Sequence, residues 1–288
     1  MLNRLAVFSH FDKNFVVQNY VFFYLSELSK LNIDIIFVSD CDIEDKYLNK
    51  LSKYVIHSIT GRHNEYDFGS YKRGFLFARE NLDLNKYDEL LFINDSCYAP
   101  LFPIKNMFDK MSNLNVDFWG VTSNFNSYFS NISHIQSYFI AFKKQVFLSD
   151  LFNNFILNIK QEINKKEVIK KYEIGLTDLL NKNGFSFDVF SELSKKHYAV
   201  QLLFYKEIVT RDKVPFVKRN IPLLKAFVLP FNFKNFIIKH TSYDYSLIER
   251  DSINKNHNSI IFFILVLYKF VARKFILFIR NLFVRISI

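Results

Sequence analysis

The amino-acid sequence predicts an α/β fold in which a mostly parallel sheet is covered by helices on both faces. Short apolar runs typical of buried strands alternate with amphipathic stretches along the first half of the chain. The clearest run, residues 90–93, leads directly into the polar triplet Asn94, Asp95 and Ser96. Ligands bind beyond the carboxyl ends of the strands in open α/β sheets, so this triplet could meet a nucleotide, a sugar or a metal. A turn or a helix cap explains the same residues equally well.

The expected elements follow one another in a regular order. Strands are predicted over residues 5–8, 34–38, 90–93, 118–122 and 138–142. Helices are predicted over residues 16–30, 70–81, 104–111, 145–160 and 166–183. Pro103 opens the third helix, and Gly184 ends the last one. Strands that alternate with helices favour a parallel sheet. Residues 211–230 are basic and contain prolines, which fits either an active-site flap or a surface connection.

Length and composition set the expected domain organisation. A chain of 288 residues, half of them hydrophobic, can bury a sizeable core, and 6 Gly and 5 Pro leave little material for flexible linkers. We expect one domain over residues 1–250 and a tail over residues 251–288. Cys41 and Cys97 keep no metal-ligand spacing, and no disulfide scaffold is expected. The first residues lack the apolar core of a signal peptide, so a cytoplasmic protein is expected.

The charge indicates an anionic partner. The formal net charge is +10, which suits nucleic acid, an anionic lipid surface or a phosphate-bearing substrate. Residues 260–288 contain no acid and place five cations among large apolar side chains. The apolar run 260–268 is too short to cross a bilayer, so the tail is predicted to be an amphipathic helix in the headgroup region. A terminal helix packed on the protein is the alternative. Nucleic acid is not expected, because the cations gather in an apolar tail rather than a stacking groove.

A second polar segment lies upstream, at residues 64–74. It combines Asp67, Gly69, Lys72 and Arg73 in one passage from loop to helix. Gly69 would let the backbone approach a ligand closely, and the amides at the start of the helix favour an anion. A capped helix with a solvated basic face is the alternative.

Six short motifs occur in order: YDFGSYKRG, YDELLFINDSCYAPLFP, DFWGVT, HIQSYFIAFKK, YEIGLTDLL and VPFVK. With these motifs the chain resembles the rhamnan synthesis F family of bacterial surface-polysaccharide proteins, over roughly residues 4–225. The resemblance implies a glycosyltransferase with a GT-A-like, nucleotide-diphosphosugar-binding domain. It also implies a role in the assembly of rhamnose-containing polysaccharide, lipopolysaccharide, O-antigen or capsule.

The resemblance assigns a donor site. It places residues 94–96 where GT-A enzymes keep an Asp-x-Asp motif, whose acids hold the divalent cation that bridges the donor's diphosphate. Only Asp95 is acidic here. Mg²⁺ or Mn²⁺ could bind through this carboxylate and the phosphates, with His240 as a candidate further ligand, so metal dependence stays open. Nucleotide and donor contacts are expected at Ser9, His10, Asp12, Asp67, Gly69, Lys72, Asn94 and Ser96.

Glycosyl transfer needs positive charge for the departing diphosphate and a base for the acceptor hydroxyl. The charge could come from Asp95 through a metal, or from Lys72, Arg73 or the basic stretch 211–219.

For the base, the resemblance favours Glu173, on a helix beside the acceptor, ahead of Asp178 and Asp117. The edge of the acceptor pocket is expected at Gln136, Ser137 and Tyr138.

Two classes of function follow. The leading hypothesis is a membrane-associated glycosyltransferase at the cytoplasmic face of the inner membrane. It would move a sugar such as rhamnose from a nucleotide-diphosphosugar to a lipid-linked glycan. The alternative is a non-catalytic scaffold subunit of the polysaccharide machinery that has lost the second motif acid. The presence of Asp67, Asp95 and Glu173 favours the enzyme.

Overall fold

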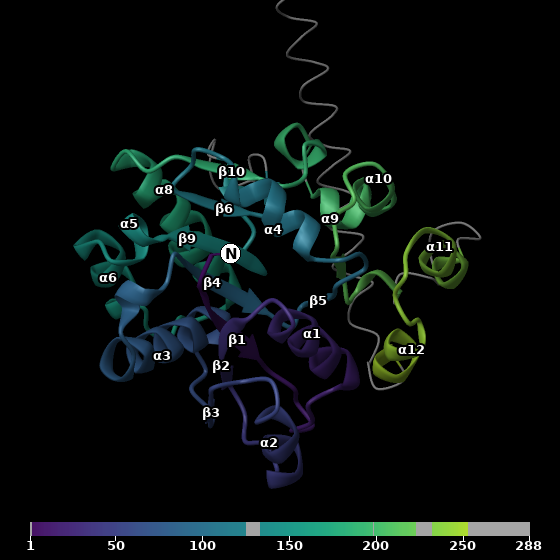
Figure 1. Cartoon of the computed structure of the whole chain (residues 1–288), viewed down its shortest axis with the longest axis horizontal. Helices are drawn as coiled ribbons and strands as arrows, with labels where there is room; N and C mark the ends of the chain where they lie inside the picture. Colours follow the sequence, from purple (N-terminus) through teal and green to yellow (C-terminus); the bar gives the residue numbers. More distant parts are fainter. Residues whose placement is uncertain (1, 125–132, 198, 223–231, 253–288) are drawn as a thin grey trace, which may run out of the picture.

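A seven-stranded sheet forms the centre of the molecule (Figure 1) in a computed structural model that describes residues 2–124, 133–197, 199–222 and 232–252. In order across the sheet, the strands are β10 (Phe187–Val189), β6 (Phe118–Gly120), β9 (Phe139–Lys143), β4 (Glu89–Asn94), β1 (Arg4–His10), β2 (Ile33–Ser39) and β3 (His57–Thr60). β1 pairs in parallel with β2 and β4, β3 in parallel with β2, and β10 in parallel with β6. Only β9 runs antiparallel to its neighbours in this sheet of the described chain. The predicted α/β fold with a mostly parallel sheet is confirmed.

Helices cover both faces of this sheet (Figure 1). One face carries α3 (Tyr66–Asn81), α5 (Lys144–Phe147), α6 (Asp150–Leu157), α7 (Lys165–Val168) and α8 (Gly175–Lys182). The other face carries α1 (Asn19–Ser29), α2 (Asp45–Leu51), α4 (Lys105–Ser112), α9 (Val200–Leu203) and α10 (Tyr205–Thr210). Beyond this layer, α11 (Phe233–His240) and α12 (Ser246–Ser252) join the same apolar core, and α12 packs against α1. The central strands are apolar throughout because both faces are buried: Leu5 and Val7 of β1 pack under the first set of helices, and Ala6 and Phe8 under the second.

Close contact between α3 and the sheet depends on a glycine. A Cβ at Gly74 would lie 2.3 Å from Val7 Cγ1, so only a residue without a side chain allows this approach. This packing holds the start of α3, and with it Asp67, against the carboxyl ends of β1 and β4.

Two helix boundaries show how local signals decide the structure. The helix predicted over residues 145–160 is two helices, because the Ser149 side chain accepts a hydrogen bond from Phe152 N (3.2 Å) and caps a new helix, α6. The predicted stop at Gly184 is confirmed: this residue has φ +89°, and Phe185 N donates to Leu180 O (3.0 Å) in a Schellman turn. Between α7 and α8, residues Ile169–Ile174 form a π-helical turn.

Within the described residues, four two-residue strands lie outside the main sheet. β5 (Cys97–Tyr98) pairs antiparallel with β11 (Val217–Lys218), and β7 (Ser123–Asn124) pairs antiparallel with β8 (His134–Ile135). β11 belongs to the basic segment 211–230, whose residues 223–230 lie outside the described residues. The strand predicted over residues 118–122 ends at Gly120, after which the chain turns into β7.

A buried ion pair closes the amino end of the sheet. Arg4 Nε lies 2.6 Å from Glu89 Oε2, and Trp119 Nε1 donates to Glu89 Oε1 (2.9 Å). Arg4 also donates to Ser112 Oγ (2.8 Å) on α4. These contacts join β1, β4, β6 and α4 on the side of the sheet opposite to the polar triplet.

In the described part of the chain, every helix is too short or too polar to span a bilayer. The predicted amphipathic tail lies outside the described residues from residue 253 onward.

Candidate functional site

Polar side chains gather at the carboxyl ends of β1, β2 and β4, together with the residues that enter β9. They form two groups. The carboxylate cluster contains Asp67, Asn94, Ser137 and Glu173, and the arginine cluster contains Asp95, Arg219 and Asp251. Parallel strands end at one edge of a sheet, which is why segments distant in sequence meet here.

In the carboxylate cluster, one serine hydroxyl bridges two acids. Ser137 Oγ lies 2.5 Å from Glu173 Oε2 and 3.1 Å from Asp67 Oδ2. Ser137 N also donates to Glu173 Oε2 (2.9 Å), and Asn94 Nδ2 donates to Asp67 Oδ2 (3.1 Å). A hydroxyl carries one hydrogen, so Ser137 can donate to only one of the two carboxylates at a time.

Local structure places each member of the carboxylate cluster. Asp67 lies in the first turn of α3, and Asn94 is the last residue of β4. Ser137 precedes β9, and its carbonyl accepts a hydrogen bond from Tyr71 Oη (2.8 Å) on α3. Glu173 lies in the π-helical turn before α8. A π-helical turn contains one residue more than an α-helical turn and is frequent at functional sites.

The surroundings shift the pKa values of Asp67 and Glu173 in opposite directions. Burial raises the pKa of Asp67, and neighbouring Glu173 raises it further, against the lowering effect of Lys165 and Ser137. Burial also acts to raise the pKa of Glu173, but His134 and the Ser137 hydroxyl and amide outweigh it and lower this pKa to about 2. His134 Nε2 lies 3.4 Å from Glu173 Oε1. Neighbouring acids with separated pKa values are typical of sites that hold and release protons.

The arginine cluster lies next to the first. Arg219 donates to both oxygens of Asp251, from Nη2 (2.9 Å) and from Nε (3.1 Å), and Nη1 lies 3.5 Å from Asp95 Oδ2. Tyr98 Oη donates to Asp251 Oδ2 (2.6 Å). The guanidinium stacks over the ring of Tyr20, with its carbon 4.6 Å from the ring centroid. A buried guanidinium needs such acid partners, because an unpaired buried charge is strongly destabilising.

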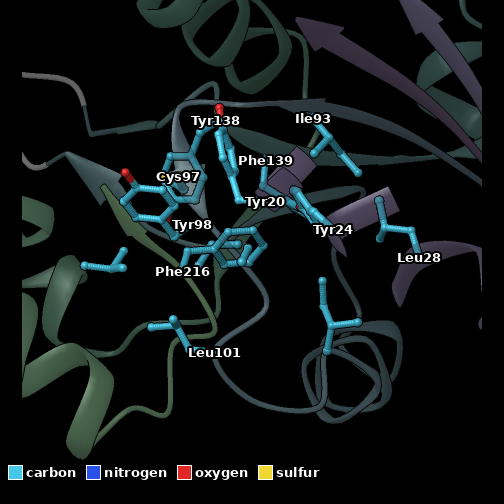
Figure 2. Close-up of a cluster of buried hydrophobic side chains, with 14 of the residues drawn as sticks. Tyr20, Tyr24, Leu28, Ile93, Cys97, Tyr98, Leu101, Tyr138, Phe139 and Phe216 are labelled. Carbon is cyan, nitrogen blue, oxygen red and sulfur yellow. The ribbon is translucent and has the colours of Figure 1, made fainter. Parts of the chain in front are cut away.

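The basic segment reaches this site through β11. Val217 pairs with Tyr98 and Lys218 with Cys97, and Arg219 N donates to Ser96 O (3.1 Å). Beneath β11, Phe216 lies in an aromatic cluster with Tyr20, Tyr98 and Tyr138 (Figure 2). The Phe216 ring centroid is 5.5 Å from that of Tyr138.

Asn94 and Ser96 connect the two clusters. Ser96 Oγ donates to Asn94 Oδ1 (2.6 Å) and accepts from Lys218 Nζ (3.2 Å). A chain of hydrogen bonds therefore runs from Lys218 through Ser96 and Asn94 to Asp67. The polar triplet therefore forms a turn whose side chains also link the two clusters by hydrogen bonds.

The residues after β1 and β2 complete this edge of the sheet. His10 is buried, which lowers its pKa; its Nδ1 lies 3.0 Å from Ser39 Oγ and its Nε2 lies 4.0 Å from Asp95 Oδ2. Asp95 N donates to Ser9 O (3.2 Å), while the Asp12 side chain accepts from Asn14 N (2.8 Å) in an Asx turn.

Several other expected site residues have structural partners instead. Lys72 donates to Ile159 O (2.6 Å) and Arg73 to Glu65 Oε2 (2.7 Å). The space beside Gly69 holds protein, since a Cβ there would lie 2.2 Å from Glu65 Cβ, so this glycine serves packing rather than access for a ligand.

On the acceptor side, Gln136 Oε1 accepts from Thr122 Oγ1 (2.8 Å). Tyr138 is buried, and its hydroxyl accepts from Gln201 Nε2 (2.6 Å) and lies 2.8 Å from Thr122 Oγ1.

The two alternative bases lie apart from both clusters. Asp117 precedes β6 at the amino end of the sheet, where it accepts hydrogen bonds from Ser186 and Gln145. Asp178 forms an ion pair with Lys182 (2.7 Å) on α8.

Asp95, directly after β4, is the one acid of the polar triplet where a divalent cation is expected. The described residues contain no group of three or more His, Cys, Asp or Glu side chains able to hold a metal. His240 is exposed at the end of α11, where its ring packs on Phe236. Among the ion pairs of the described residues, Asp95 pairs most closely with the Arg219 guanidinium, at 3.5 Å.

Residues 35–278 match the profile of the family described as rhamnan synthesis protein F. The chain belongs to this family. The "Uncharacterized protein y4gN" of Sinorhizobium fredii is 31% identical over 166 residues, which are 57% of this chain and 43% of that protein. "Virulence protein VirA" of Vibrio anguillarum is 29% identical over an alignment of 193 positions, which covers 58% of this chain and 60% of that protein. The chain spans about half the length of these curated relatives.

Among solved structures, the apo-form glycosyltransferase GlyE of Streptococcus pneumoniae matches with a TM-score of 0.43 and 11% identity. The match covers 88% of this chain and 63% of that one.

The motifs that resemble the rhamnan synthesis F family converge in the structure. Asp67, Asn94, Ser137, Glu173 and Lys218 come from five of these motifs and are joined by the hydrogen bonds described above. Sequence reasoning missed Arg219 as an individual residue, and it missed His134 and Asp251. The HIQSYF motif contains His134, but nothing in the sequence pairs Asp251 with Arg219, because 32 residues separate them.

We expect isosteric changes of the two acids to alter stability in opposite directions. Because folding favours the protonated form of Asp67, its charge costs stability at neutral pH, and Asp67→Asn should stabilise the fold there. This advantage should vanish below about pH 4, where the wild-type group is protonated in both states. Glu173, with a pKa of about 2 against an ordinary 4.5, stabilises above its ordinary pKa and loses this contribution as the pH falls toward 2. Glu173→Gln should therefore destabilise at neutral pH, by on the order of 3 kcal/mol.

Urea denaturation at neutral and acidic pH measures both effects. Asp178→Asn, which removes a carboxylate from a surface pair on α8, is the matched control and should change stability little. Shifts of the same sign for Asp67→Asn and Glu173→Gln would contradict the opposed pKa values.

Proposed function

We propose that this chain is a glycosyltransferase of polysaccharide synthesis that uses a nucleotide-diphosphosugar donor and a glycan acceptor. The observation that supports it most strongly is the convergence of the family motifs on one edge of the sheet, where two acids share a serine hydroxyl beside a lysine and an arginine. Acids that receive a proton and cations that meet a leaving diphosphate are the two requirements of glycosyl transfer.

The proposed reaction is a displacement at the anomeric carbon. The acceptor oxygen forms a bond to this carbon while the bond from the carbon to the phosphate oxygen breaks, and that electron pair leaves with the diphosphate. The acceptor proton passes to Glu173. Ser137 then passes its own proton to Asp67 and takes the one from Glu173, which leaves the proton on the acid with the higher pKa. The relay conserves protons and uses contacts already present in the structure.

Asp95 is proposed as the central donor-site residue. It follows β4 directly, and its carboxylate lies between Arg219, His10 and the Phe11 amide, whose nitrogen is 3.5 Å from Asp95 Oδ2. The family supports rhamnose as the transferred sugar, and a lipid-linked glycan in lipopolysaccharide, O-antigen or capsule assembly as the acceptor.

Asp95→Ala should abolish transfer while the protein remains folded, because the variant loses the carboxylate at the centre of the donor site. The assay screens dTDP-rhamnose, UDP-glucose and GDP-mannose for a rise in melting temperature and then for sugar transfer. Asp109→Ala, which removes an exposed acid from α4, is the control for charge. A folded Asp95→Ala variant with near-normal transfer would remove Asp95 from the mechanism. A wild-type protein that binds none of the donors would favour the scaffold alternative.

Glu173→Gln should lower turnover by roughly 10²-fold or more, since an amide cannot accept the acceptor proton. Donor binding should change little, because Glu173 contacts Ser137 and His134 rather than the Asp95 side of the site. Single-turnover transfer and donor titration of the same variant separate the two quantities. Normal turnover would exclude Glu173 as the base and leave Asp67 as the acid to test.

The tail is proposed to hold the protein on the cytoplasmic face of the inner membrane. Its large apolar side chains would supply most of the binding, and each cation near an anionic surface adds about 1 kcal/mol. A chain truncated after Ser252 should move from the membrane fraction to the soluble fraction and still react with a water-soluble acceptor analogue. Aggregation or unfolding of the truncated chain in detergent-free buffer would instead show that the tail packs on the domain.

A further inference from the structure

The cations at this edge of the sheet differ in whether they form an ion pair with a carboxylate of the protein. Arg62 pairs with Asp40 (3.1 Å), Arg73 with Glu65 (2.7 Å) and Arg219 with Asp251 (2.9 Å). Lys218 is different: no carboxylate among the described residues lies within 4.0 Å of its ammonium group. Its contacts are the Ser96 hydroxyl at 3.2 Å and the face of the Tyr138 ring, 4.5 Å from the centroid.

The position of Lys218 is fixed by its neighbours in the chain. Its backbone pairs with Cys97 in the β5–β11 ladder, between buried Val217 and the tightly bound Arg219. The side chain is half-buried, and its ammonium nitrogen lies over the Tyr138 ring. An ammonium has three donors, and Ser96 accepts from one of them. A lysine held in this way keeps donors for an anion at little conformational cost.

The adjacent acids pair with Arg219 rather than with Lys218. Arg219 thereby positions Asp95 and the β11 backbone. Lys218 is thus a cation near Asp95 that forms no ion pair within the described residues, and these residues contain no group of three or more His, Cys, Asp or Glu side chains able to hold a metal.

We propose that Lys218 binds the diphosphate of the donor and supplies the positive charge that a divalent cation supplies at an Asp-x-Asp motif. This inference rests on the proposed function and specifies its donor site. Diphosphate binding should then need no divalent cation. Lys218 acts as a binding residue for the leaving group, and Ser96 orients its ammonium toward the end of β4.

Inorganic pyrophosphate is the probe, titrated calorimetrically into the full chain in EDTA and again in Mn²⁺. We expect the wild type to bind in EDTA. Lys218→Ala should weaken binding roughly 10- to 100-fold, the range for loss of a hydrogen bond to a charged group. Lys218→Arg should restore most of the affinity, because it returns the charge. Lys105→Ala, which removes an exposed cation from α4, is the matched control and should bind as the wild type does.

The outcomes separate this inference from the proposed function. Equal binding by Lys218→Ala and wild type, or binding by the wild type only when Mn²⁺ is present, overturns the role of Lys218 and leaves the glycosyltransferase proposal standing. Failure of the wild type to bind pyrophosphate in either buffer also overturns the role of Lys218, and the screen of nucleotide-sugars then decides the glycosyltransferase proposal. The melting temperature of each variant shows that it is folded, and Lys218→Gln provides a second neutral variant if Lys218→Ala is not.

Discussion

The site depends on a buried guanidinium that needs two acids. Arg219 contacts Asp95 after β4 and Asp251 on α12, and the side chain of Asp251 is only 3% exposed. Removing a charge of this kind from water is costly unless its partners are in place, so the ion pairs favour the packing of these three segments against one another. The ion pair thus fixes β11 against β5, and β11 in turn carries Lys218 to the end of β4.

The carboxylate cluster has a different physical basis. Asp67 and Glu173 share one serine hydrogen, and the protein stabilises the charge on Glu173 through Ser137 and His134. Asn94, Ser137 and Lys165 do not offset the burial of Asp67, whose pKa is therefore raised. Such an arrangement is costly for folding, and proteins keep strained or unfavourable groups mainly where a function requires them. Asp67 lies on α3, and the close packing of α3 on the sheet at Gly74 keeps this carboxylate buried.

The sequence was informative where structure is local. Apolar runs such as residues 90–93 predicted the central strands because both of their faces are buried, and Gly184 predicted a helix end because its positive φ suits a residue without a side chain. The break at Ser149 was missed although a serine cap causes it, since helical periodicity continues across it.

The site was less predictable than the fold because its partners are distant in sequence. Asp67, Asn94, Ser137 and Glu173 could be named as candidates, but only the three-dimensional structure shows that Ser137 joins two acids. Arg219 lies in a segment with no clear periodicity, 124 residues from Asp95. Gly69 and Lys72 have residue types suited to phosphate binding. In the structure, however, the Glu65 side chain fills the space beside Gly69, and Lys72 donates to the Ile159 carbonyl.

The position of Asp251 has a consequence for synthesis of the protein. Its carboxylate accepts from Tyr98, 153 residues earlier, as well as from Arg219. While the chain grows on the ribosome, the sheet and the Asn94 turn can form long before Asp251 emerges, but Arg219 then has no complete set of partners. A nascent chain should therefore pass through a stage with a formed sheet and an unformed donor site, and translation that stops before Asp251 should give an inactive product.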